Sequence, residues 1–162
     1  MLGAHLVSHY AGVPYHEYAT ERIFKPLKMS STTFLPSVAR RSGLLTDSWT
    51  PDGRRIPFWF TDDMVHLKAG AGGIISSADD MVKWLAVWLN EGVDPVSGQT
   101  IFPRSVYEAV TTAQRVVYGR QSLYGGGIVG YGMGWMRWQH GGIEVRAVLS
   151  YSLRSGTDWT RR

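Results

Sequence analysis

The sequence contains no cysteine, and this absence excludes disulfide bonds and thiolate metal ligands. Long apolar runs are also missing: no stretch approaches the roughly 20 residues that a membrane-spanning helix needs. The first residues lack the basic start of a signal peptide, and polar residues such as His5 and His9 interrupt their apolar character. We therefore predict no membrane segment, while the cellular compartment stays open.

Charge of one sign is not concentrated anywhere in the chain. The formal net charge is +4, but the basic residues form scattered pairs, such as Arg40-Arg41 and Arg54-Arg55. Nucleic-acid-binding proteins instead carry a basic stripe, often with aromatic residues interleaved for base stacking. This pattern favours an ordinary solvated surface, and we expect no nucleic-acid partner.

What the sequence does contain is enough apolar material for one core of ordinary size. Its 162 residues are 44% hydrophobic and include seven tryptophans. A first helix is predicted over residues 2–11, where apolar residues recur at helical spacing until Gly12 interrupts them. The face of this helix predicted to be buried consists of Leu2, Leu6, Val7 and Tyr10. A second helix is predicted between Pro14 and Pro26.

Residues 35–68 are predicted to form a loop with short strands, because prolines and glycines recur there at close intervals. The triplet Pro51-Asp52-Gly53 indicates a turn. The aromatic residues 58–60 either cover a site or form a buried edge.

The most secure element is a helix over residues 77–90. Ser77 is suited to cap it, with Asp80 as partner in a capping box, and Gly92 is suited to a left-handed C-terminal cap. Its apolar face is predicted from the spacing of Met81, Trp84, Leu85, Trp88 and Leu89. Another helix is predicted from Pro103 through Val110, and strands are predicted after residue 125, the last of them over residues 143–153.

Three motifs follow one another in a fixed order. Residues 69–89 read AGAGGIISSADDMVKWLAVWL, residues 131–135 read YGMGW, and residues 140–142 read His-Gly-Gly. This order resembles the second half of the β-lactamase-related serine hydrolases, the superfamily of class C β-lactamases, D,D-peptidases and related esterases. Residues 1–34, which begin MLGAHLVSHYAGVPYHEYATERIFKPLKM, resemble a stretch that follows the second catalytic motif of that family, with Lys28 in place of its usual glycine.

The family's first two catalytic motifs are absent from the sequence. No serine is followed three residues later by lysine, so Ser-x-x-Lys is missing, and the only asparagine, Asn90, is not part of a Tyr-x-Asn motif. The resemblance places Tyr-x-Asn a few residues before Met1. We therefore expect a fragment: residues 1–153 form a partial β-lactamase-related domain, and residues 154–162 form a tail.

The fold that the resemblance implies is α+β. It is a partial penicillin-binding/serine β-lactamase-like fold, helix-rich in its first two thirds and followed by antiparallel strands. The central sheet of that fold is shared between the two ends of the domain, so we expect the strand over residues 143–153 to present an unpaired apolar edge.

The function that the resemblance implies for the complete parent is acyl-enzyme hydrolysis of a small ester, amide or β-lactam. We expect the isolated chain to be inactive, and the alternative is a non-catalytic binding or assembly module of the same fold. The resemblance assigns His140 to a strand that forms one wall of the cleft. It assigns oxyanion stabilisation to the backbone that follows Gly142, with the N–H of Ile143 as donor.

Three other patterns indicate no site. Residues 125–130 match G-x-G-x-x-G, but no apolar strand precedes them and no helix follows. His5 and His9 share a helix face without a third metal ligand nearby. Asp62, Asp63 and His66, with Lys68 close by, are best interpreted as a solvated loop. We therefore predict no cofactor and no bound metal. Oligomeric state is not predicted.

Overall fold

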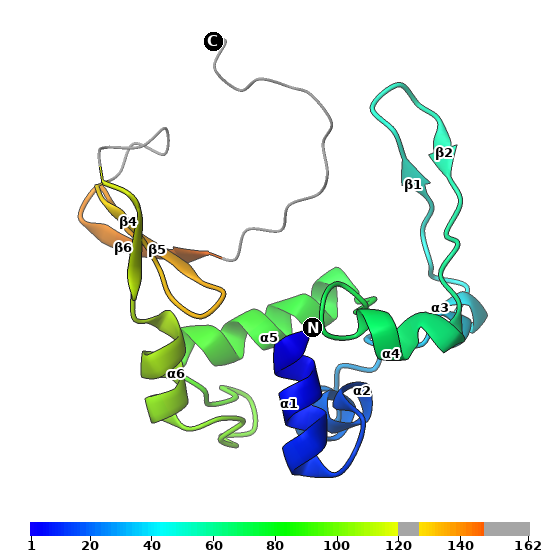
Figure 1. Cartoon of the computed structure of the whole chain (residues 1–162), viewed down its shortest axis with the longest axis horizontal. Helices are drawn as coiled ribbons and strands as arrows, with labels where there is room; N and C mark the ends of the chain where they lie inside the picture. Colours follow the sequence, from blue (N-terminus) through cyan, green and yellow to red (C-terminus); the bar gives the residue numbers. More distant parts are fainter. Residues whose placement is uncertain (120–126, 148–162) are drawn as a thin grey trace. The chain divides into compact units, whose positions relative to one another are not determined.

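The computed structural model describes residues 1–119 and 127–147, which belong to two compact units (Figure 1). The regular structure of the first unit, Met1–Ile101, is mostly helix. Its helices are α1 (Leu2–Ala11), α2 (Tyr15–Ala19), η1 (Thr20–Phe24), α3 (Pro36–Arg41), η2 (Asp62–Met64), α4 (Val65–Lys68) and α5 (Ala78–Leu89). Between α3 and η2 lies a small hairpin of β1 (Ser48–Trp49) and β2 (Arg55–Ile56).

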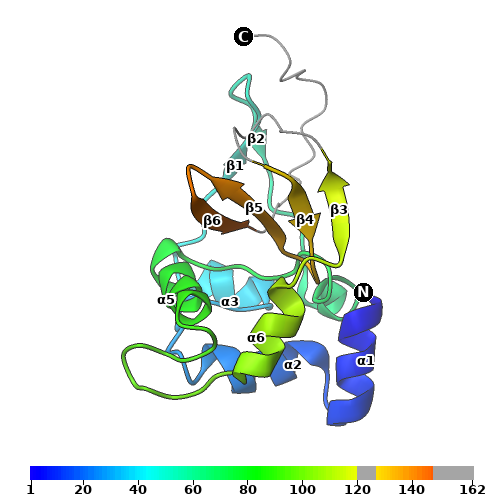
Figure 2. The same cartoon turned by 90° about the vertical axis from the view of Figure 1, so that its left-hand side faces the viewer.

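The second unit begins at Phe102, and its described residues combine one helix with an antiparallel sheet. The helix is α6 (Arg104–Thr111), and the strands are β3 (Arg115–Tyr118), β4 (Val129–Tyr131), β5 (Met136–His140) and β6 (Ile143–Ala147). Sequential strands are neighbours, in the order β3-β4-β5-β6 (Figure 2). This confirms the predicted α+β class, with helices first and antiparallel strands after them. No helix in the described part of the chain is long and apolar enough to cross a membrane.

The predicted helices at residues 2–11 and 14–26 are present. Gly12 adopts φ 69° and ends α1, with its N–H donating to the Ser8 carbonyl. The second helix is α2 and its continuation η1, which widens into a π-helical turn. It leads into the core of the first unit, where the buried rings of Phe24 and Phe34 stack at 5.5 Å between centroids.

The predicted buried face of α1 is wrong, and the predicted apolar face of α5 is only partly covered, with Trp84 and Trp88 half-buried. No residue of α1 is buried, and Leu2 and Tyr10 are 73% and 84% exposed. On α5 the buried residues are Asp80 and Val87, whereas Leu89 of the predicted face is 84% exposed. Periodicity identified these helices correctly, but which side is covered depends on what packs there.

Residues 35–68 contain more helix than predicted. Pro36 occupies the first turn of α3, where a missing N–H removes no helical hydrogen bond. η2 and α4 were also missed, because helices this short carry too few residues for a periodic signal. The predicted turn at Pro51-Asp52-Gly53 is confirmed: it joins β1 to β2, and Gly53 adopts φ 81°.

Asp80 ties the start of α5 to a distant loop. Ser77 caps the helix by accepting the Asp80 N–H, as predicted, but the Asp80 carboxylate does not complete the capping box. It is 2% exposed and accepts the Ser31 N–H at 2.7 Å and the Thr32 hydroxyl at 2.8 Å. Lys83 also donates to it at 2.7 Å. Hydrogen bonds from three residues therefore compensate the burial of this carboxylate.

Among the described residues, two that are not glycine adopt left-handed backbone conformations. Lys28, at the position where the resemblance gives glycine, has φ 51°, and its carbonyl accepts a hydrogen bond from the Lys83 ammonium at 2.7 Å. Glu91 has φ 54° and ends α5, while the Gly92 N–H donates to the Val87 carbonyl at 2.9 Å. This is a Schellman cap in which Glu91 is the first left-handed residue after the C-cap, and Gly92, the residue predicted for the cap, follows it with φ 104°.

In the second unit, the YGMGW segment packs against the end of α6. The Met133 N–H donates to the Val110 carbonyl at 2.9 Å. A β-carbon on Gly132 would lie 2.4 Å from the Val110 carbonyl oxygen and 2.7 Å from that of Thr112. Only glycine allows this close approach.

We predict that Asp80→Ala lowers the free energy of unfolding by about 3 kcal/mol, because it removes hydrogen bonds to a buried charge. The control Asp79→Ala, one residue away and exposed, should cost less than about 1 kcal/mol. Burial raises the pKa of Asp80, but hydrogen bonds from Lys83, Thr32 and Ser31 lower it by more. Its stabilisation is therefore complete at neutral pH and is lost as the pH falls below about 4. Urea unfolding of both variants across pH measures this, and equal losses in the two would contradict it.

Candidate active site

The predicted site residues lie on the hairpin formed by β5 and β6. His140 is the last residue of β5 and Ile143 is the first of β6, and the two are paired. Gly141 and Gly142 connect them with φ 56° and 82°. Two consecutive positive φ values in a two-residue loop are typical of a type I′ turn, which favours glycine.

The geometry of this turn bears on the predicted roles. His140, Gly142 and Ile143 are all exposed. In a tight turn the N–H of the fourth residue points back to the carbonyl of the first, here from Ile143 toward His140. An N–H held in this way is poorly placed to stabilise an oxyanion. The cleft-wall role of His140 and the donor role of Ile143 stay predictions, and the turn weighs against the second.

A charged cluster fixes the same hairpin and was not predicted. Arg137 of β5 lies opposite Arg146 of β6. The Glu144 carboxylate accepts from Arg137 at 2.5 Å and also pairs with Arg146. The Arg146 guanidinium lies over the Tyr107 ring of α6, 4.9 Å from its centroid. Like charges on facing strands are held together by the acidic residue between them, so this cluster is structural.

The structure shows where the histidine pair, the glycine-rich match and the acidic cluster noted in the sequence lie. His5 and His9 are exposed on α1. Of the G-x-G-x-x-G match, residues 125 and 126 lie outside the described residues, and its last two residues belong to β4. Asp62 accepts the Ser37 N–H at 2.9 Å, and hydrogen bonding from Ser37 lowers the pKa of Asp62. Residues 1–119 and 127–147 contain no group of three or more His, Asp or Glu able to hold a metal.

Two boundary predictions extend past the described residues. β6 covers Ile143–Ala147, and the rest of the strand predicted to reach residue 153 lies outside the described part. The predicted boundary between the domain and the tail of residues 154–162 lies there too.

A family model described as Beta-lactamase matches residues 1–158. The chain belongs to the beta-lactamase family. Because of this match, the order of helices and strands is that of a beta-lactamase-family domain, as the motif order predicted. A comparison with curated proteins finds no match.

Solved structures of this beta-lactamase-family fold resemble the chain over part of their length. The octameric penicillin-binding protein homologue from Pyrococcus abyssi aligns with a TM-score of 0.56 and 20% identity, covering 88% of this chain and 30% of that one. A D-stereospecific amidohydrolase from a Streptomyces species aligns with a TM-score of 0.59 and 21% identity, covering 90% of this chain and 39% of that one. The chain thus spans about a third of the length of these two proteins.

We predict that Gly141→Val lowers the free energy of unfolding by about 1–2 kcal/mol, because a β-branched residue resists positive φ. Gly141→Asn should be close to neutral, because asparagine tolerates this conformation and suits a type I′ turn. Gly119→Val is the control, since Gly119 lacks positive φ and has open space around it. Urea unfolding distinguishes the three. If Asn proves as damaging as Val at residue 141, the turn assignment is wrong.

Proposed function

We propose that this chain is part of a serine hydrolase of the beta-lactamase family and that it does not hydrolyse substrates by itself. The observation that carries the proposal is that no serine in the 162 residues is followed three positions later by lysine. Acyl transfer in this family needs the serine nucleophile and its activating base together, since either group alone contributes little. The family match over residues 1–158 supports the ancestry.

In this proposal the complete enzyme forms and hydrolyses an acyl-enzyme on a small ester, amide or β-lactam. This chain supplies the helical unit and the β5–β6 hairpin, with His140 near the substrate. The position of His140 at an exposed strand end is compatible with such a role. The serine, its lysine and the Tyr-x-Asn motif come from residues that this sequence does not contain.

We expect no covalent adduct when the chain is incubated with a fluorophosphonate or a penicillin-type acylating probe, because no activated serine is present. Intact-mass measurement tests this. The positive control for the probe is a beta-lactamase-family enzyme that contains both the Ser-x-x-Lys and the Tyr-x-Asn motif. A stoichiometric adduct on a serine of the wild-type chain that disappears in His140→Ala would contradict the inactive reading.

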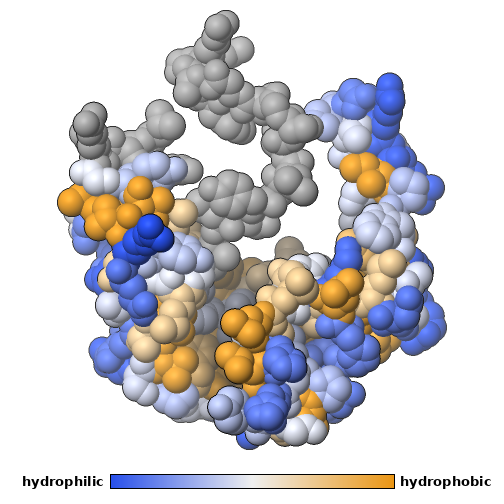
Figure 3. All heavy atoms as spheres, viewed as in Figure 1, coloured by the Kyte–Doolittle hydropathy of each residue, from blue (hydrophilic) through white to orange (hydrophobic). Residues whose placement is uncertain are grey.

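The second candidate function is a non-catalytic assembly module of the same fold. It is favoured by the apolar residues that α1 exposes, among them Leu2, Leu6 and Tyr10. Figure 3 shows hydrophobic surface, in orange, on the face of the molecule where α1 lies. Exposed apolar surface of this kind marks interaction sites or aggregation-prone faces. An octamer is described for the Pyrococcus homologue.

If α1 mediates assembly, the wild-type chain should bind a hydrophobic dye and associate as its concentration rises. The double variant Leu2→Gln/Tyr10→Gln should reduce both effects severalfold, because it removes exposed apolar surface. Val96→Gln is the matched control, since Val96 is 93% exposed and lies in a loop outside α1. Sedimentation velocity measures the association. A wild-type chain that stays monomeric and binds no dye would rule out this candidate.

A further inference from the structure

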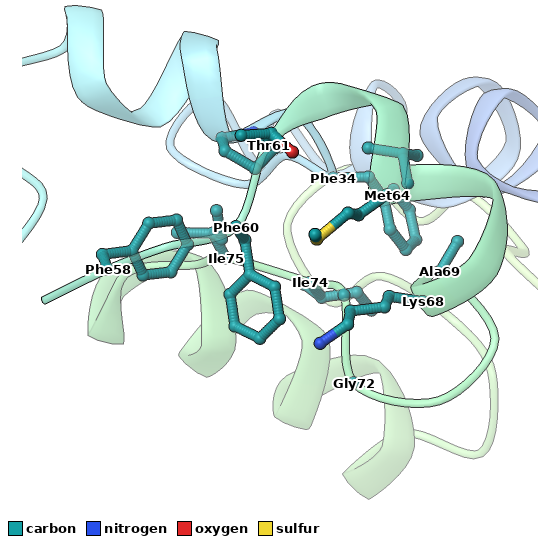
Figure 4. A pocket seen from close by; sticks show the side chains of 13 residues that line it. Phe34, Phe58, Phe60, Thr61, Met64, Lys68, Ala69, Gly72, Ile74 and Ile75 are labelled. Carbon is teal, nitrogen blue, oxygen red and sulfur yellow. The ribbon is translucent and has the colours of Figure 1, made fainter. Parts of the chain in front are cut away.

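The first unit contains a pocket that the hydrolase proposal does not use (Figure 4). It encloses about 90 Å³ between residues 58–61, the η2–α4 turn and residues 72–75. Its lining is mainly apolar and aromatic, including Phe34, Phe58, Phe60, Met64 and Ile75. From the sequence, residues 58–60 were expected either to cover a site or to form a buried edge. In the structure, Phe58 and Phe60 line the wall of this pocket.

One cation faces the pocket. The half-buried Lys68 lines it, with the ammonium 3.6 Å from the centroid of the Phe60 ring and 4.4 Å from that of Trp59. No carboxylate in the described part of the chain forms an ion pair with Lys68. Ring contacts compensate only part of an ammonium's lost hydration, so the group retains capacity for an anion.

The walls of the pocket are fixed before any ligand arrives. The Arg40 guanidinium of α3 donates to the carbonyls of Phe58 at 3.0 Å and Phe60 at 2.8 Å. The nearby Asp62 carboxylate accepts a hydrogen bond from the Ser37 N–H of α3 at 2.9 Å, so this negative charge is bound on the α3 side. Ile75 is paired with Thr33 through two backbone hydrogen bonds. A preorganised pocket loses little entropy when it binds.

We propose that this pocket binds a short branched-chain monocarboxylate, with the alkyl group among the aromatic side chains and the carboxylate paired with Lys68. Apolar walls with one well-placed polar group are typical of small-molecule sites. A cavity of about 150 Å³ accommodates benzene, so about 90 Å³ fits a smaller group, such as the isobutyl group of isovalerate.

Ligand-observed NMR on the full chain tests this with isovalerate and its neutral analogue isovaleramide. We expect saturable binding, with isovalerate about fivefold tighter than the amide, which is the scale of a partly exposed ion pair. Lys68→Met should bring isovalerate to the affinity of the amide, and Lys68→Arg should preserve the preference. Added salt should weaken only the binding of the carboxylate.

Two further variants separate the pocket from non-specific attraction. Lys25→Met removes an exposed cation elsewhere in the same unit and should leave both affinities unchanged. Gly72→Leu adds a side chain to the pocket lining at a residue with open space and no positive φ, so it should weaken both ligands without straining the backbone. Circular dichroism checks that each variant is folded. The proposal is overturned if the folded wild type binds neither ligand, binds both equally, or keeps its preference in Lys68→Met.

Discussion

The first unit depends on the hydrogen bonds that the buried Asp80 carboxylate accepts. It joins the first turn of α5 to the backbone of Ser31 and the hydroxyl of Thr32, nearly fifty residues earlier in the chain. Lys83 extends the link, since its ammonium bonds both Asp80 and the carbonyl of Lys28. A charge with so little contact with water is tolerated only because each of these donors is in place.

The same network connects the scaffold to the apolar pocket. Thr32 also bonds the Ser76 hydroxyl at 2.7 Å, and the adjacent residues Thr33 and Ile75 are paired through their backbones. Ile75 lines the pocket. The position of one pocket wall therefore follows from where α5 begins, which Ser77 and Asp80 determine together.

Local signals in the sequence predicted the longer helices and several helix ends and turns, but they missed α3, η2 and α4. Ser77 as a cap, Gly12 as a helix end and the Pro51-Asp52-Gly53 turn each depend on a few neighbouring residues whose backbone preferences are strong. The beta-lactamase family was also predictable, because several motifs occur in a fixed order over much of the chain.

Features that depend on distant neighbours were not predictable in this way. The exposed side of α1 has the same spacing of apolar residues as a buried one would have. The pocket gathers residues from 34 to 75, and no local pattern marks Lys68 as its cation. His140-Gly141-Gly142 fits both a catalytic motif and a hairpin turn, and only the pairing of His140 with Ile143 places it in a turn.

The two units also differ in how far apart their contacting residues lie along the chain, and this has a consequence for folding kinetics. In the second unit each strand pairs with the next one along, and β5 meets β6 across a two-residue loop. Such a hairpin closes in about 1–10 μs. The Asp80 contacts must instead close a loop of 48 or 49 residues, with a larger loss of chain entropy. We infer that the β5–β6 hairpin forms early and that burial of the Asp80 charge is a late step.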